Sequence, residues 1–358
     1  MKSVLVGVGQ AGGKVTQALT EYDSQHGYGT VVGALAINTA EPDLKPLTIP
    51  KLLIGQDRVG GHGVGADNEL ATEIMSADID DVMEALDGRV TAKAESVFVV
   101  AGLGGGTGSG GAPMLVHELK RVYDVPVYAL GILPGRDEGS IYQVNAGRSL
   151  KTIAREADAT LLVSNDAWRA SGESVEEGFD AINRRIADRV GLVMAAGELT
   201  GAVAESVVDS SEVINTLRPG KLASIGYADA EAAEEAVENV HTIMSTTRNA
   251  VLNGTSLPKA STAEAGLFIV AGDPDRISRK GVERARKWME DELGCMQVRG
   301  GDFPLSDDRI RVIVVMGGIE RSERITELMD RAREGLDRRD DGPDATEALL
   351  NDDLDGLI

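Results

Sequence analysis

Six glycines stand among the eight residues 104–111, interrupted only by Thr107 and Ser109. The run follows an apolar stretch, residues 96–101, that predicts a strand, and it opens onto a helical pattern. Because glycines carry no side chains, backbone N–H groups and the positive end of the next helix can point directly at phosphate oxygens. A long flexible turn is the alternative, but a turn needs only one or two glycines. The run therefore predicts a phosphate-binding loop.

The apolar stretches of the first half alternate with helical patterns, which is typical of a parallel α/β sheet of the Rossmann-like kind. Such a sheet binds ligands outside the carboxyl ends of its strands, where the glycine-rich segments begin. The strands are expected at residues 3–8, 31–37, 52–54, 96–101, 126–133 and 159–164.

The second half begins with one long helix, expected over residues 175–194, where apolar residues such as Phe179, Ile182 and Ile186 recur at spacings of three and four. A second α+β domain follows. We expect its helices near residues 203–217, 230–252, 276–293 and 322–336, and its strands near 266–271 and 310–316. The predicted division is a nucleotide-binding domain in 1–174, a central helix and linker in 175–202, the α+β domain in 203–336 and an acidic tail in 337–358.

The tail has too little apolar surface to pack, and we expect it to be disordered. Its last ten residues carry leucines that could line one side of a short helix in the groove of an adaptor protein. A solubilising tail with stray leucines is the alternative.

Charge and composition exclude several partners. The 58 acidic and 36 basic residues give a net charge of −22, which repels nucleic acid and anionic membrane surfaces. Aromatic residues make up 3%, too few for base-stacking platforms. Such a chain also repels its own copies unless salt screens the charge. At molar salt the Debye length, over which charges act on each other, falls to about 3 Å. A salt-rich, halophilic cytoplasm is the favoured interpretation, and an ordinary acidic cytosolic protein is the alternative.

The single cysteine, Cys295, predicts a reducing compartment and a position in or near the core. The segment after Met1 runs directly into the first strand, and no apolar stretch approaches 18 residues. We therefore expect a soluble cytoplasmic protein without direct membrane insertion.

The first glycine-rich segment, residues 7–14, fits the dinucleotide pattern GxGxxG between a strand and a helix. The pattern also expects an acid near the end of the second strand, which instead ends Ile37-Asn38-Thr39. A nicotinamide-dependent oxidoreductase is therefore disfavoured. Val8 and Val15 also exclude a Walker loop. Glycine loops at 7–13, 60–65 and 104–111 follow three strands and could together wrap a polyphosphate.

These loops resemble those of the tubulin/FtsZ family, whose signature GGGTG[ST]G stands here at residues 104–110. The resemblance runs in order up to about residue 336, and the mixture of features is most similar to the archaeal CetZ group. It implies a GTPase that assembles head to tail into protofilaments, with GTP or GDP as ligand and Mg²⁺ carried mainly by the phosphates rather than by protein ligands. It also implies a cytoskeletal role in cell shape or motility. A GTP-binding scaffold or regulator with weak hydrolysis and limited polymerisation is the alternative.

The resemblance also implies the residues that bind the nucleotide. Those expected at the phosphates are Gln10, Ala11, Gly12, Gly13, Lys14, Gly63, Gly65, Ala66, Gly105, Gly106, Thr107 and Gly108. Of these, Gly63, Gly65 and Ala66 are assigned to the γ-phosphate. Asn38 is also expected to bind the nucleotide. Glu138 would accept from sugar hydroxyls, although Tyr142 stands where FtsZ proteins commonly carry an arginine.

Three further residues are implied for guanine: Asn165, Phe179 and Asn183. Residues four apart share a helix face, so Phe179 can stack on the base while Asn183 bonds its edge. The alternative is that Phe179 belongs to the core and Asn183 to the helix surface.

In this family the acids that complete the site come from the next subunit, and the matching segment is 207–213. Asp209 and Glu212, three apart on one helical face, could orient and polarise the attacking water on the neighbour's GTP. Val207 replaces the family's asparagine, and Glu212 stands where FtsZ commonly has aspartate. The alternative is a solvated helix start, where acids are favoured in any case.

Overall fold

The computed structural model describes residues 1–167, 175–198, 208–258, 262–295, 297–320 and 322–337. One mixed ten-stranded sheet runs through this part of the chain, in the order β3-β2-β1-β4-β5-β6-β7-β10-β8-β9. The strands are β1 (Ser3–Val8), β2 (Val31–Asn38), β3 (Lys51–Leu53), β4 (Ser96–Gly102), β5 (Val127–Leu133), β6 (Ala159–Ser164), β7 (Leu222–Glu231), β8 (Ala265–Gly272), β9 (Val298–Pro304) and β10 (Arg309–Ile319).

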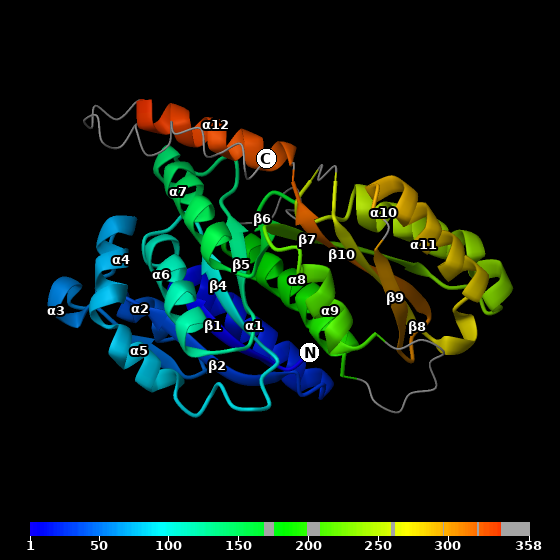
Figure 1. Cartoon of the computed structure of the whole chain (residues 1–358), viewed down its shortest axis with the longest axis horizontal. Helices are drawn as coiled ribbons and strands as arrows, with labels where there is room; N and C mark the ends of the chain where they lie inside the picture. Colours follow the sequence, from blue (N-terminus) through cyan, green and yellow to red (C-terminus); the bar gives the residue numbers. More distant parts are fainter. Residues whose placement is uncertain (168–174, 199–207, 259–261, 296, 321, 338–358) are drawn as a thin grey trace.

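The first six strands are parallel, as the alternating pattern predicts. The C-terminal strands join this sheet through a short parallel pairing, Thr160 with Leu222 and Leu161 with Ala223. Beyond that junction, β7, β10 and β8 are antiparallel neighbours. The sheet is therefore continuous across the two halves of the chain (Figure 1).

Helices cover both faces of the sheet. They are α1 (Gly9–His26), α2 (Glu41–Leu44), α3 (Gln56–Val59), α4 (Asn68–Ala77), α5 (Ile79–Leu86), α6 (Thr107–Val122), α7 (Ser140–Glu156), α8 (Val175–Ala196), α9 (Ser210–Leu217), α10 (Val240–Leu252), α11 (Arg279–Leu293) and α12 (Glu323–Asp337). In Figure 1, α12 lies along α7, and α10 lies beside α11 over the C-terminal strands.

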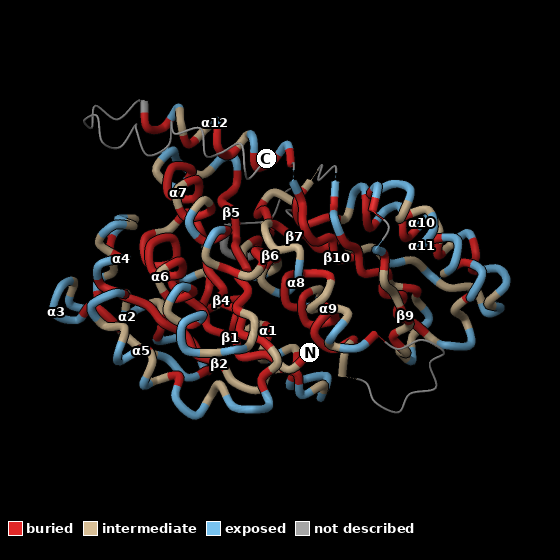
Figure 2. Tube along the Cα trace, in the orientation of Figure 1, coloured by how far each residue is buried: buried red, intermediate tan, exposed pale blue. Residues whose placement is uncertain are grey.

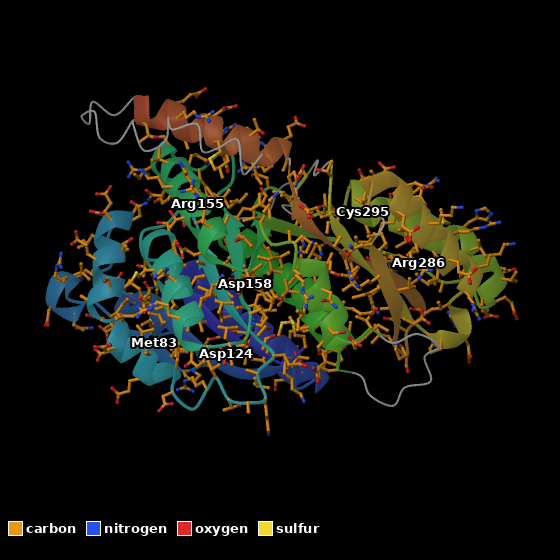
Figure 3. All side chains as sticks on the ribbon, in the orientation of Figure 1. Met83, Asp124, Arg155, Asp158, Arg286 and Cys295 are labelled. Atoms are coloured by element: carbon orange, nitrogen blue, oxygen red, sulfur yellow. The ribbon has the colours of Figure 1, made fainter. Side chains whose placement is uncertain are left out.

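The core follows the two-residue period of the strands. Val4 and Val6 of β1 belong to the core that includes Met75 of α4, while Leu5 belongs to the core that includes Ile186 of α8. Figure 2 shows this buried interior running along the strands of both halves. Cys295 is buried after α11, as the sequence predicts (Figure 3). None of the described helices is long and apolar enough to cross a membrane.

The C-terminal half differs from expectation in three places. Strands β7 and β9 were not predicted. The helix expected over 230–252 begins only at Val240, because Ala230 and Glu231 pair with Ile310 and Arg309 of β10. This segment is rich in alanine and glutamate, so its helix propensity is overridden by pairing with a buried strand. The helix expected over 203–217 begins at Ser210 after Asp209 as its N-cap, and residues 203–207 lie outside the described part of the chain.

Candidate functional site

The first glycine-rich segment is mostly helix rather than loop. Strand β1 ends at Val8, and α1 begins at Gly9, so Gln10 through Lys14 form the first turns of the helix. Gly12 lets α1 approach the sheet, because a Cβ there would lie 2.1 Å from the carbonyl oxygen of Val100. Gln10 is exposed, and Ala11 and Lys14 are half-buried, at the carboxyl edge of the sheet.

The second half of the 104–111 run also differs from the predicted loop. Only Gly104, Gly105 and Gly106 form the turn, because α6 begins at Thr107. Gly108 and Gly110 are packing positions: a Cβ would lie 2.6 Å from the oxygen of Gly102 and 1.9 Å from that of Asn68. The run therefore serves close packing as well as ligand approach.

Gly105 is the one position of the run where the added Cβ meets no atom within 4 Å. Its backbone faces open space at the N-terminus of α6, where a helix favours anions. We expect Gly105→Ala to fold like the wild type and to weaken nucleotide binding at least about tenfold, because the methyl group would occupy the ligand's approach. Gly110→Ala should instead lower the free energy of unfolding by about 1–3 kcal/mol through overpacking. Nucleotide titration and thermal unfolding of both variants check this; unchanged affinity in Gly105→Ala would contradict it.

The turn at 104–106 contacts the glycine-rich segment around residues 60–66. A Cβ on Gly106 would lie 2.4 Å from Val64 Cγ2 and 3.1 Å from the backbone of Ala66. Gly63 and Gly65 have φ of 82° and 59°, and Ala66 shares this left-handed conformation with φ 67°. The structure thus brings the three predicted phosphate segments together, since Gly9 likewise approaches the backbone of Gly108.

An acid that sequence reasoning missed lies beside them. Asp43 of α2 accepts hydrogen bonds from Gln10 Nε2 and Asn38 Nδ2, both at 3.1 Å. Asn38 Oδ1 accepts in turn from the backbone N–H of Thr39 at 2.8 Å. Asp43 thus ties the end of β2 to the start of α1.

The predicted sugar and base residues meet at the next two strand ends. Glu138 Oε1 accepts from the backbone N–H of Gly135 at 2.6 Å and from Asn165 Nδ2 at 3.2 Å. Gln143, buried in α7, donates to the carbonyl of Gly135 at 2.7 Å. The segments 134–139 and 165–166 are therefore held as one unit.

A buried arginine of α12 supports this unit and was also missed. Arg324 is 1% exposed, and its guanidinium donates to the carbonyl of Pro134 at 2.6 Å and to Ser164 Oγ at 3.2 Å. It also pairs with Asp166 at 3.7 Å, and its burial lowers the pKa of the guanidinium. Its signal in the sequence was a charge on the apolar stripe of a helix, four residues before Leu328.

The two helix residues assigned to guanine lie one turn apart on α8. Phe179 and Asn183 are both half-buried, whereas Ile182 and Ile186 are fully buried in the core. Helix α8 runs along α1, and a Cβ on Gly191 would collide with the Tyr22 ring at 2.4 Å. Phe179 is thus not a fully buried core residue.

The predicted catalytic acids lie at the opposite edge of the sheet. Ser210, the first residue of α9, donates from Oγ to Glu95 Oε2 at 2.9 Å, and Glu95 immediately precedes β4. The glycine turns follow the carboxyl ends of β1 and β4. Strands of six and seven residues span about 20 Å, so the two groups are separated by roughly the height of the sheet.

We expected Asp209 and Glu212 to share a face of one helix. Asp209 instead precedes the helix, as the N-cap of α9. Its Oδ1 accepts from the backbone N–H of Glu212 at 3.1 Å and from Ser211 Oγ at 2.5 Å. The Ser211 hydrogen bond holds the pKa of Asp209 below its usual range. Val207 lies outside the described residues.

Glu212 itself is half-buried, and burial raises the pKa of its carboxyl. Its Oε2 is buried without a hydrogen-bond donor among the described residues. Because the side chain as a whole is only half-buried, its carboxylate can still accept a hydrogen bond from a water molecule that reaches its exposed part.

The cap makes a testable prediction. Asp209→Ala should lower the free energy of unfolding by about 1 kcal/mol, because α9 loses an acceptor for its first N–H groups. Asp209→Asn keeps an acceptor oxygen and should retain most of that stability. Denaturant unfolding of both variants measures the cap, and equal losses in the two would contradict it. GTP turnover of Asp209→Asn then reports whether the charge is needed.

This α/β architecture matches known proteins. Residues 2–173 match the GTPase-domain model of the tubulin/FtsZ family, and residues 172–334 match the C-terminal domain model of tubulin-like CetZ. The chain is 63% identical to tubulin-like protein CetZ2 of Haloferax volcanii over 360 residues, covering all of both chains.

Two solved structures are also similar. A GTPγS-bound protofilament of CetZ2 from Haloferax volcanii superposes with a TM-score of 0.91 at 64% identity, over 94% of this chain and 99% of that one. A GDP-bound monomer of CetZ1 from the same organism gives 0.86 at 46% identity, over 94% and 100%. Fold and comparisons define a GTPase of the tubulin type. The chain belongs to the tubulin/FtsZ family, within its CetZ group.

Proposed function

We propose that the chain binds GTP and GDP at the carboxyl edge of strands β1 to β6. One observation supports this proposal most directly. The backbone of Gly105 faces open space in the turn at 104–106, which packs against residues 64–66. The phosphates would lie on the N-termini of α1 and α6, with Gly63, Gly65 and Ala66 at the γ-phosphate. The similar CetZ2 and CetZ1 structures hold GTPγS and GDP.

The sugar and base would lie across the unit formed by Glu138 and Asn165. Among the described residues, Gly135 and Asn165 both donate to Glu138 Oε1, so Oε2 would accept from a sugar hydroxyl. Asn165 would meet guanine, with Phe179 stacked on the ring and Asn183 on its edge. Asn38 would act through Asp43, which also holds Gln10.

Mg²⁺ would be held mainly by phosphate oxygens and water, since it keeps several waters when it binds nucleotides. It would neutralise charge on the phosphates during hydrolysis. The described residues contain no group of three His, Cys, Asp or Glu side chains that could hold a metal ion. The hydroxyls of Thr39 and Thr107 lie 2.7 Å apart beside the turn at 104–106. They fit this arrangement, because a hydroxyl is a neutral oxygen ligand.

We also propose that copies assemble head to tail, and that Glu212 and Asp209 of one copy complete the site of the next. Their position at the far edge of the sheet supports this, because they cannot reach the nucleotide of their own subunit across about 20 Å of strand. Such a heterologous contact repeats without closing. The Glu212 carboxylate would polarise the attacking water, and the capped start of α9 would fix its position.

The assembly would act in cell shape or motility in the cytoplasm. An adaptor protein could bind the acidic tail, whose residues 338–358 lie outside the described part of the chain. The alternative scaffold with weak hydrolysis is separated by kinetics. GTP turnover per subunit, measured against protein concentration at high salt, should show a threshold and a steep rise that coincides with sedimentation. A flat rate per subunit from dilute protein upward would reject assembly-coupled hydrolysis.

A further inference from the structure

One buried amide of α7 joins two of the glycine turns. Asn145 is 2% exposed, and its Nδ2 lies 2.7 Å from the carbonyl oxygen of Ala66 and 3.2 Å from that of Gly104. The carbonyl of Gly105 is 3.4 Å away. An amide nitrogen carries two hydrogens, so one points at the loop containing Ala66 and the other at the turn after β4. Asn145 therefore ties together two segments that lie far apart in the sequence and pack against each other at Gly106 and Ala66.

The loop that Asn145 holds is strained. Ala66 has φ 67°, a left-handed conformation that costs a residue with a Cβ about 1–2 kcal/mol. Neighbouring Gly63 and Gly65 share this region of φ, and a Cβ on Gly65 would meet no atom within 4 Å. The loop thus has open space on one side, and the hydrogen bond from Asn145 to Ala66 fixes it on the other.

We infer that Asn145 is a positioning residue that lets the site distinguish a nucleoside triphosphate from a diphosphate. This inference rests on the proposed function, in which residues 63–66 contact the γ-phosphate and Gly105 contacts the inner phosphates. Without the amide, Ala66 is free to leave its left-handed conformation, and the 63–66 loop moves away from the turn at 104–106. A triphosphate then loses contacts that a diphosphate never makes.

The same helix offers a matched control. Ser149 lies one turn after Asn145 on α7, is also 2% exposed, and its hydroxyl has no hydrogen-bond partner among the described residues. Ser149→Ala removes a buried polar group from the same helix face without touching either glycine turn. It separates loss of the Asn145 bridge from general damage to α7.

The test compares dissociation constants of GTPγS and GDP in full-length protein kept below its assembly threshold, which sedimentation verifies. In Asn145→Ala the dissociation constant of GTPγS should rise about tenfold while that of GDP changes less than about twofold. Ser149→Ala should leave both constants within about twofold of wild type. A merely structural role of Asn145 would weaken both nucleotides together.

Equal weakening of both nucleotides, or no change for either, overturns the inference. If Asn145→Ala does not fold, Asn145→Ser decides, since serine is too short to reach both turns and should show the same selectivity. Wild-type protein that binds neither nucleotide would instead reject the proposed function itself. Amide hydrogen exchange provides a second readout: residues 63–66 should exchange faster in Asn145→Ala and not in Ser149→Ala.

Discussion

Glu212→Gln should slow GTP hydrolysis in the assembled protein about 10²–10⁴-fold and leave nucleotide affinity of the isolated subunit unchanged. The substitution keeps the shape and half-buried position of the side chain but removes the charge that polarises water. Turnover is measured at protein concentrations where both variants sediment equally. Glu292→Gln, at an exposed position of α11, is the matched control and should retain wild-type turnover.

The pH profile gives a second readout for Glu212. Burial raises the pKa of its carboxyl, and only the charged form can accept a proton from water. Turnover should therefore fall as pH decreases, starting at a higher pH than an ordinary glutamate would give. That limb of the profile should be absent in Glu212→Gln. Wild-type turnover in the glutamine variant, or lost nucleotide binding, would show that Glu212 has another role.

Arg324→Met should lower the free energy of unfolding by about 2–4 kcal/mol, the largest stability effect that we expect of an arginine here. The variant leaves the carbonyl of Pro134 and the hydroxyl of Ser164 without their buried donor. Asp166 keeps part of its compensation, because it also pairs with Arg136 at 3.3 Å. The segments 134–139 and 165–166 lose their common support, so nucleotide affinity should fall as well.

Arg333→Met is the control on the same helix. Arg333 pairs with Asp330 across one turn of α12 and is 40% exposed, so its loss should cost less than about 1 kcal/mol. Denaturant unfolding measures both variants. Similar midpoints for the two would mean that the buried arginine does not support the nucleotide loops.

The sequence predicted those parts of the fold and site that depend on local pattern. The parallel strands follow from apolar runs, and the turn at 104–106 follows from its glycines. It could not predict β7 or β9, because their local sequence does not decide between helix and strand. Pairing with the distant strands β10 and β8 makes them strands. The sequence predicted a helix face for Asp209, whereas its side chain accepts from the N–H three residues on and makes it the N-cap of α9.

The residues that sequence reasoning missed are those whose partners are remote. Asn145 bonds a carbonyl 79 residues away, and Arg324 bonds one 190 residues away. Neither position belongs to a motif, and each has value only through the loops that the fold brings to it. Only the apolar stripe around Arg324 gave a hint, since a charge there must be buried and paired.

The central claim is that one copy supplies the acid for the nucleotide of the next. Two impaired variants test it when mixed at a GTP concentration that saturates Glu212→Gln but lies below the weakened dissociation constant of Gly105→Ala: the first retains its nucleotide site, and the second retains its acid. The mixture should hydrolyse GTP well above the summed rates of the separate variants, because the Gly105→Ala copy presents an intact Glu212 to GTP on its neighbour. A mixture that co-sediments and yet shows only the summed rate would contradict the claim.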